Sequence, residues 1–471
     1  MRHQFSLIFL ANIAEVSRKI CIFANRNRIH TDMRRKLYDR LLDWKSDPAR
    51  KPLILEGARQ VGKTWLLKEF GSKEYDNMVY VNCHDHPETH QFFQQDLNVN
   101  RILQAFEAYS RQRIVAGKTL VFIDEIQEAP HAIESLKYFC EEAREQHVVV
   151  AGSLLGVVNR PGESFPVGKV NTLRLMPMSY EEFLWALGAD ALADGVAQCN
   201  WTLMADMRVS YEEHLRQYYY VGGMPEAVLH YTTQGDVNGV RRIQEEILSN
   251  YSSDFAKHAA GETQRIRMVW DSIPSQLARE NKKFIYGAVR KGGRARDLEN
   301  AIQWLVDAGL VHKVYRCARP AMPLKFYRDP AAFKLYLLDI GLLGALSEAP
   351  AMQMLVSNDV FKEFKGAFSE NYVVQQMMNV PSLSAYYYSK DNSRLEVDFL
   401  VQHGERVIPV EVKAEENVKS KSLAQFVKVD FAEEQLRGLR ISMKPYADQG
   451  WMENIPLYAA EGYLNSEKTI E

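Results

Sequence analysis

The feature that most constrains this chain is a glycine-rich loop that joins a short apolar run to a helical pattern. The loop has the form G-x-x-x-x-G-K-T and runs from Gly57 to Thr64, directly after the apolar residues 53–55. Glycines allow backbone conformations in which successive N–H groups converge on a phosphate at the start of a helix. The pattern therefore predicts a P-loop, a strand–loop–helix unit that binds nucleotide phosphates.

The residue types in and near this loop indicate which part of ATP or Mg2+ each residue would contact. Lys63 is expected to reach the β- and γ-phosphates, and Thr64 to give its hydroxyl oxygen to Mg2+. The apolar run 118–123 predicts a buried strand that delivers Asp124 to the metal and Glu125 to the attacking water. The predicted ATP-binding residues are Gly57, Ala58, Arg59, Gln60, Val61, Gly62, Lys63 and Thr64.

Composition narrows the classes of partner and the cellular location that the protein is expected to have. A chain of 471 residues suggests about three domains, and its net charge of −2 gives no global attraction to nucleic acid or to a membrane. The five cysteines contain no C-x-x-C pair, and no apolar run approaches the roughly 18 residues of a membrane span. These features predict a cytoplasmic protein without a membrane partner. Residues 1–32 are predicted to be a disordered extension, because the first amphipathic helix begins naturally after Met33.

Strands alternate with helices between residues 50 and 175, which predicts a doubly wound α/β domain with its ligand at the carboxyl ends of the strands. The run 147–153 is a further strand that ends in Ser153, a candidate for contact with the γ-phosphate. The alternative is a plain turn at Gly152-Ser153. The ligand-rich stretch from Cys83 to His90 is better explained by a loop beside the nucleotide than by zinc, because Pro87 interrupts it.

Five stretches together resemble one known family. They are GARQVGKT at 57–64, FIDEIQ at 122–127, AGS at 151–153, LMPMSYEEFL at 175–184 and GGMPEAV at 222–228. The sequence from 33 to about 440 resembles the prokaryotic family of predicted AAA+-superfamily ATPases. That family carries a C-terminal domain of unknown function that resembles restriction endonucleases.

The resemblance implies an ATPase core over 33–177 and a helical lid over 178–255. It also implies that Glu125 activates water, that Ser153 senses the γ-phosphate, and that Gly222-Gly223-Met224-Pro225 lies near the nucleotide. Relatives often have arginine where Lys169 follows Gly168, and lysine cannot reproduce the forked guanidinium of arginine. No arginine finger can therefore be assigned, and whether the chain forms a homo-oligomer with shared sites stays open.

Residues 256–345 have a different character. Three short helical patterns, at 273–280, 285–289 and 296–308, are followed by strand patterns, an order that fits a winged-helix module. Six basic residues lie between Lys282 and Arg296, enough to neutralise several phosphates of DNA. The alternative is a packing module whose charged run is simply a solvated face.

A second group of polar residues lies in the predicted domain 346–440. A two-residue turn at Gly404-Glu405 would place Asp398 directly across a hairpin from Glu411, with Lys413 on the same face. Together with Glu370 on the preceding helix, this pattern is similar to the PD-(D/E)-x-K nuclease core. Two carboxylates and a lysine can bind Mg2+ and support phosphodiester hydrolysis. The alternative is an inactive nuclease fold, and residues 441–471 are treated as a tail.

The fold class that follows is α/β: an AAA+-like P-loop NTPase domain, a helical lid, a winged-helix module and a PD-(D/E)-x-K nuclease-like domain. The functional interpretation is an ATPase that uses Mg2+ and is coupled to a nucleic-acid-binding or nuclease-like domain. The alternative is a nucleotide-gated interaction protein, or a DNA-binding regulatory protein, with an inactive nuclease fold.

Overall fold

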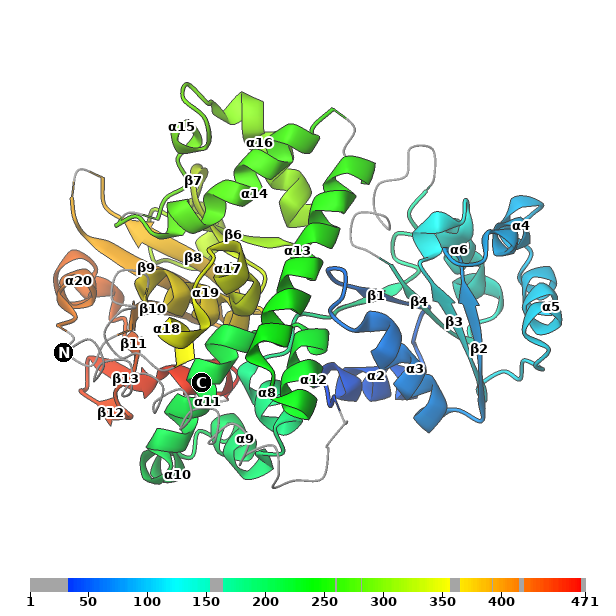
Figure 1. Ribbon diagram of the computed structural model, residues 1–471, viewed down its shortest axis with the longest axis horizontal. Coiled ribbons are helices and arrows are strands. Elements are labelled where there is room, and N and C mark those ends of the chain that lie inside the picture. Colours follow the sequence, from blue (N-terminus) through cyan, green and yellow to red (C-terminus); the bar gives the residue numbers. More distant parts are fainter. Residues whose placement is uncertain are drawn as a thin grey trace, which may run out of the picture. The chain divides into compact units, whose positions relative to one another are not determined.

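The structure is a computed structural model, and its chain divides into two compact units (Figure 1). One unit contains Arg35–Met176 and Glu299–Val311, and the other contains Pro177–Leu298 and His312–Glu471. The structure describes residues 33–152, 164–258, 261–280, 282–355, 365–391, 393–414 and 419–466. The predicted extension 1–32 and Ser153 lie outside the described residues.

The first unit, here called the P-loop unit, is built on a parallel sheet, as the sequence predicts. In the described part of this unit the strand order is β2-β3-β4-β1-β5, and all adjacent strands are parallel. The strands are β1 (Leu53–Glu56), β2 (Asn77–Asn82), β3 (Thr119–Asp124), β4 (His147–Ala151) and β5 (Asn171–Arg174). The helices are α2 (Leu37–Ser46), α3 (Lys63–Glu74), α4 (Gln91–Gln94), α5 (Val99–Ser110) and α6 (Ala132–Glu142).

Helices cover both faces of this sheet. Val121 and Ile123 of β3 belong to one apolar cluster with Phe106 of α5 and Phe139 of α6. On the opposite face α3 approaches closely, because a Cβ placed at its Gly71 would lie 3.2 Å from Leu120 Cδ2. Every residue of β3 is buried, as expected for a central strand of a parallel sheet. The carboxyl end of β3 is therefore fixed from both sides.

The second unit, here called the C-terminal unit, contains a mixed sheet. Its described strands form an eight-stranded sheet in the order β12-β13-β11-β10-β9-β8-β6-β7. Their bounds are β6 (Val311–Cys317), β7 (Arg328–Leu337), β8 (Ser384–Ser389), β9 (Glu396–His403), β10 (Arg406–Lys413), β11 (Gly438–Ser442), β12 (Ala447–Asp448) and β13 (Met452–Pro456). Strands β8, β9 and β10 are antiparallel neighbours, whereas β11 is parallel to both β10 and β13.

Helices make up the rest of the C-terminal unit. Before the sheet come α8 (Tyr180–Ala186), α9 (Asp190–Ala197), α10 (Trp201–Asp206), α11 (Arg208–Val221), α12 (Pro225–Gln234), α13 (Val237–His258), α14 (Thr263–Leu277) and α15 (Tyr286–Val289). Between and after the strands lie α17 (Ile340–Leu346), α18 (Ala351–Leu355), α19 (Lys365–Met377), α20 (Lys421–Gln425) and α21 (Ala460–Leu464). Helix α16 (Ala295–Asp307) crosses the division between the two units.

Two features of the C-terminal unit differ from the sequence analysis. Helices α14, α15 and α16 are followed by the neighbouring strands β6 and β7, which is the predicted order, but these two strands belong to the large sheet. The fold also continues beyond 440, where a tail was predicted. Strand β13 extends the sheet, and residues of α21 are buried. Both differences come from long-range strand pairing, which local hydrophobic periodicity does not reveal.

The paired glycines at 222 and 223 have a packing role. A Cβ at Gly223 would lie 2.1 Å from the carbonyl oxygen of Met178, and one at Gly222 would lie 2.2 Å from Asp339 Oδ1. Gly223 N donates to Asp339 Oδ2 over 2.6 Å, and its carbonyl accepts from Met178 N over 2.7 Å. The glycines therefore allow three segments of the C-terminal unit to meet, a role that requires no nucleotide.

Candidate functional site

The P-loop follows β1 and ends in the first residue of α3. Gly62 has φ +95° and precedes α3, a conformation that side chains rarely adopt. A Cβ at Gly57 would lie 2.4 Å from the carbonyl oxygen of Leu175, so the loop begins against the end of β5. Both glycines of the motif are thus required by the local backbone. The loop leads into a helix N-terminus, where backbone N–H groups favour an anion.

Lys63 is the buried cation of this loop. Its side chain is only 8% exposed, and Nζ donates to the carbonyl oxygens of Gly57 and Ala58 over 2.9 and 2.8 Å. Burial lowers the pKa of Lys63 to about 8, although the carboxylates of Glu125 and Asp124 oppose the shift. The ammonium is therefore held by dipoles of the loop itself, in a place where it is poorly solvated.

Asp124 ends β3 and meets the P-loop at Thr64. Thr64 Oγ1 donates to Asp124 Oδ2 over 2.9 Å, and Glu125 N donates to Oδ1 over 3.1 Å. Burial raises the pKa of the Asp124 carboxyl, and its hydrogen bonds from Thr64 and Tyr80 oppose that rise. A hydroxyl and a carboxylate this close together are oxygen ligands of the kind that Mg2+ prefers. Thr64 and Asp124 thus fit the predicted metal site.

Glu125 is the first residue after β3, in a left-handed backbone conformation with φ +49°. Its side chain is half-buried, and the amide of Gln127 donates to its Oε2. The structure thereby brings Lys63, Thr64, Asp124 and Glu125 to one end of the sheet, as predicted. Ser153, the predicted γ-phosphate contact, lies outside the described residues.

Sequence reasoning missed two polar partners of these acids, Gln127 and Tyr80. Tyr80 OH donates to Asp124 Oδ2 over 3.0 Å from the neighbouring strand β2. Gln127 comes two residues after Glu125, so its place in the FIDEIQ stretch was a usable signal. The sequence signal for Tyr80 was weaker. Strand β2 can be recognised locally, but its pairing in register with β3 depends on residues that are far apart in the sequence.

The predicted nuclease-like residue Glu370 is engaged by lysines. The Lys282 ammonium forms an ion pair with Glu370 Oε1, and Tyr336 OH donates to Oε2 over 2.8 Å. Lys334 Nζ lies 3.7 Å from the same Oε2 and 2.6 Å from Glu396 Oε1. Burial alone would raise the pKa of Glu370, but the ammonium groups of Lys282 and Lys334 outweigh it and hold the pKa below its usual range.

The hairpin that carries the other acids has the predicted register. Its pairs run from Arg406 opposite His403 to Val410 opposite Phe399, so Glu411 follows opposite Asp398. Asp398 Oδ2 accepts from Val412 N over 2.8 Å, and burial and the Glu370 charge raise its pKa. Lys413 Nζ lies 3.2 Å from Glu411 Oε1.

These carboxylates do not form a ready metal site. Within the described ranges no group of three His, Cys, Asp or Glu side chains is placed to hold a metal ion. Glu411 is 5% exposed, and its Oε2 has no hydrogen-bond partner in the described part of the chain. Glu370 and Glu411 are instead each paired with lysine.

The basic segment 282–296 is only partly available to a ligand. Lys282 does not belong with the predicted DNA-binding residues, because its side chain is only 14% exposed and forms an ion pair with Glu370. Arg290, Lys291 and Arg294 are exposed in and around the turn before α16, as is Arg296. A positively charged surface therefore remains at this turn, but it is smaller than the sequence suggested.

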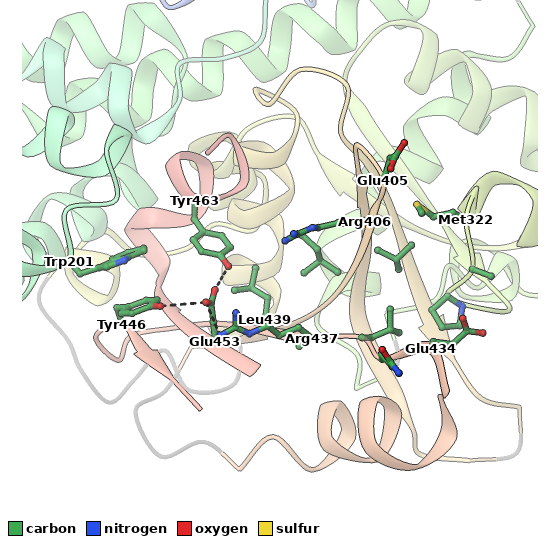
Figure 2. Close-up of a pocket in the computed structure, with 17 residues that line it drawn as sticks. Trp201, Met322, Glu405, Arg406, Glu434, Arg437, Leu439, Tyr446, Glu453 and Tyr463 are labelled. Atoms are coloured by element: carbon green, nitrogen blue, oxygen red, sulfur yellow. Dashed lines mark hydrogen bonds and ion pairs between the residues drawn. The ribbon is translucent and has the colours of Figure 1, made fainter. Parts of the chain in front are cut away.

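A separate pocket of about 650 Å³ lies in the C-terminal unit near the starts of β10 and β11 (Figure 2). Trp201 stacks on Tyr446 with ring centroids 4.5 Å apart. In Figure 2 the hydroxyls of Tyr446 and Tyr463 both point to Glu453, which also pairs with Arg437 at 3.0 Å. None of the predicted site residues line this pocket. Glu453 is therefore engaged by three of the side chains that line the pocket.

Comparison with family models divides the chain into three stretches. Residues 49–184 match a model described as an AAA domain. Residues 212–353 and 365–459 match two domains of unknown function, DUF8612 and DUF4143. The residues that match the AAA domain model lie mostly in the P-loop unit. The nuclease-like assignment of the C-terminal unit gains no support from these descriptions.

Solved structures give distant similarities. Cdc6p from Pyrobaculum aerophilum is 13% identical, with a TM-score of 0.25, over 69% of this chain and 96% of that one. The RuvB Holliday junction branch migration motor from Thermotoga maritima is 16% identical, with a TM-score of 0.29, over 62% and 93%. A STAND protein with a tetratricopeptide repeat sensor from Pyrococcus horikoshii is 13% identical, with a TM-score of 0.24, over 76% and 47%.

These TM-scores are all below 0.5, so the functional argument rests on the AAA domain model and on the site geometry. No curated protein matches the sequence. None of the helices in the described ranges is long and apolar enough to cross a membrane.

Proposed function

We propose that the P-loop unit binds ATP together with Mg2+ and hydrolyses it. The observation that carries this proposal is the convergence of Thr64 and Asp124, whose oxygens lie 2.9 Å apart beside the buried ammonium of Lys63. These groups stand at the carboxyl ends of parallel strands, where ligands of open α/β sheets bind. The match of residues 49–184 to an AAA domain supports the same reading.

Each residue has a distinct task in this proposal. The loop N–H groups and the Lys63 ammonium bind phosphate oxygens and offset their negative charge. Thr64 and Asp124 hold Mg2+, which supplies further neutralisation of phosphate charge when it is bound. Glu125 orients the attacking water and accepts its proton, while Gln127 fixes the Glu125 carboxylate through a hydrogen bond. Ser153 is retained as the proposed contact to the γ-phosphate.

ATP turnover by the full chain tests this function. The wild-type protein should release phosphate from ATP only when Mg2+ is present, and Lys63→Ala should abolish both tight ATP binding and turnover. Lys73→Ala is a matched control, since Lys73 lies in the last turn of α3 and is exposed. A wild-type protein that binds no ATP, or a Lys63→Ala variant with unchanged turnover, would contradict the proposal.

A second proposal concerns nucleic acid, and the path of α16 supports it. The exposed residues Arg290, Lys291 and Arg294 precede α16, and the turn that follows α16 lies against the P-loop. A Cβ at Gly309 in that turn would be 3.7 Å from the backbone N of Ala58. We infer that DNA phosphates bind at this basic turn. The lysine-paired carboxylates favour nucleic-acid binding without cleavage.

Two measurements separate these alternatives. Duplex or single-stranded DNA should change the ATP turnover rate, and this effect should weaken with added salt and in the double variant Arg290→Ala/Arg294→Ala. Mg2+-dependent nicking that disappears in Asp398→Ala would show instead that the C-terminal unit is an active nuclease. Turnover that is insensitive to DNA would favour a nucleotide-gated protein that acts on protein partners.

A further inference from the structure

Tyr80 lies on β2, the strand next to the one that carries Asp124. The two strands pair in parallel register, with Tyr80 opposite Phe122 and Asn82 opposite Asp124. The Tyr80 hydroxyl lies 3.0 Å from Asp124 Oδ2. It therefore approaches the same carboxylate oxygen that Thr64 Oγ1 approaches from α3 at 2.9 Å.

The Tyr80 ring is fixed by its surroundings. Lys68 Nζ stands 3.9 Å from the ring centroid, a cation–π contact, and the Phe122 ring packs at a centroid distance of 5.1 Å. The side-chain amide of Asn82 donates to the Tyr80 oxygen over 3.3 Å. Since a phenol has one proton and Asn82 already donates to its oxygen, that proton is directed at Asp124.

We propose that Tyr80 is a positioning residue that holds the Asp124 carboxylate in place for Mg2+, an inference that rests on the ATP site proposed above. Asp124 is 3% exposed, so water cannot fix its orientation. Thr64 is itself a proposed Mg2+ ligand, which leaves Tyr80 as the side-chain donor dedicated to Asp124 Oδ2. The hydroxyl also stabilises the ionised form of a buried carboxyl.

The test is equilibrium binding of a fluorescent ATP analogue to the full chain in a Glu125→Gln background, titrated with Mg2+. Tyr80→Phe removes the hydroxyl and keeps the ring on Lys68 and Phe122. We expect the Mg2+ concentration for half-maximal binding to rise by about tenfold, the scale of a lost hydrogen bond to a charged group. Affinity in the presence of EDTA should stay at the Glu125→Gln value.

A matched control sharpens this test. Tyr75→Phe also removes a hydrogen-bonded phenol from the P-loop unit, since Tyr75 OH lies 2.7 Å from His147 Nδ1, and it should leave the Mg2+ titration unchanged.

The outcomes are distinguishable from failure of the ATP proposal. An unchanged Mg2+ titration in Tyr80→Phe would overturn the positioning role. Equal loss of binding with Mg2+ and with EDTA would also overturn it, because that result indicates general damage to the fold. A parent protein that binds no nucleotide under either condition would refute the ATP site itself, and the inference with it.

Discussion

Nucleotide binding should draw a proton onto Lys63 near pH 8. Without nucleotide, burial lowers the pKa of this ammonium to about 8, so about half of the protein carries neutral Lys63 at that pH. Phosphate oxygens beside the side chain would favour its charged form and raise the pKa. Binding at pH 8 should therefore take up about half a proton, falling to about a tenth at pH 7 and rising to about nine tenths at pH 9.

Calorimetry measures this uptake directly. Binding of ATP to the Glu125→Gln variant is titrated in buffers with different ionisation enthalpies, and the slope of observed enthalpy against ionisation enthalpy gives the number of protons taken up. The nucleotide phosphates are already ionised at pH 8. Lys63→Arg is the control, because a guanidinium stays protonated and should take up none. A zero slope at pH 8, or an equal slope in Lys63→Arg, would refute the reasoning.

Three further predictions concern the C-terminal unit. Gly223→Ala should lower its unfolding free energy by about 3 kcal/mol in urea titrations, because the new Cβ would meet the Met178 carbonyl at 2.1 Å. Gly287→Ala, where a Cβ meets nothing within 4 Å, should be neutral or slightly stabilising, and a similar loss in both variants would contradict the packing argument. Lys282→Met should cost about 3 kcal/mol at pH 7, since it leaves Glu370 with one ammonium fewer, and an unchanged urea midpoint would argue against this pair. Because the pKa of Glu370 is lowered in the fold, its contribution is lost as pH falls, so Lys282→Met should also unfold at higher pH in acid titrations, and coincident acid midpoints would contradict that role.

The parts of the site that the sequence could predict are those encoded in short stretches. The P-loop and the strand ending at Asp124 are local patterns of glycine and apolar residues, and the structure places both at the carboxyl ends of strands in the parallel sheet. The hairpin of β9 and β10 was equally local, because a two-residue turn at Gly404 fixes which residues face each other. Its register was therefore predictable down to Asp398 and Glu411.

The parts that escaped prediction depend on contacts between distant segments. Lys282 and Lys334 reach Glu370 from outside the domain assigned to it, so the sequence could not show that this acid was already paired. Strand β6 pairs with β8 across about seventy residues, and that pairing joins the predicted hairpin to the large sheet. Tyr80 contacts Asp124 because β2 and β3 are neighbouring strands in the sheet, and the spacing of the sequence motifs does not reveal that contact.

The central claim is that this chain hydrolyses ATP with Glu125 as the base. Single-turnover phosphate release, measured with equal amounts of ATP bound to wild type and to Glu125→Gln, tests it most directly. The account predicts that Glu125→Gln binds Mg2+ and ATP as tightly as wild type but releases phosphate at least about a hundredfold more slowly. Equal rates of phosphate release in the two proteins, or the absence of release from wild type with ATP bound, would contradict it.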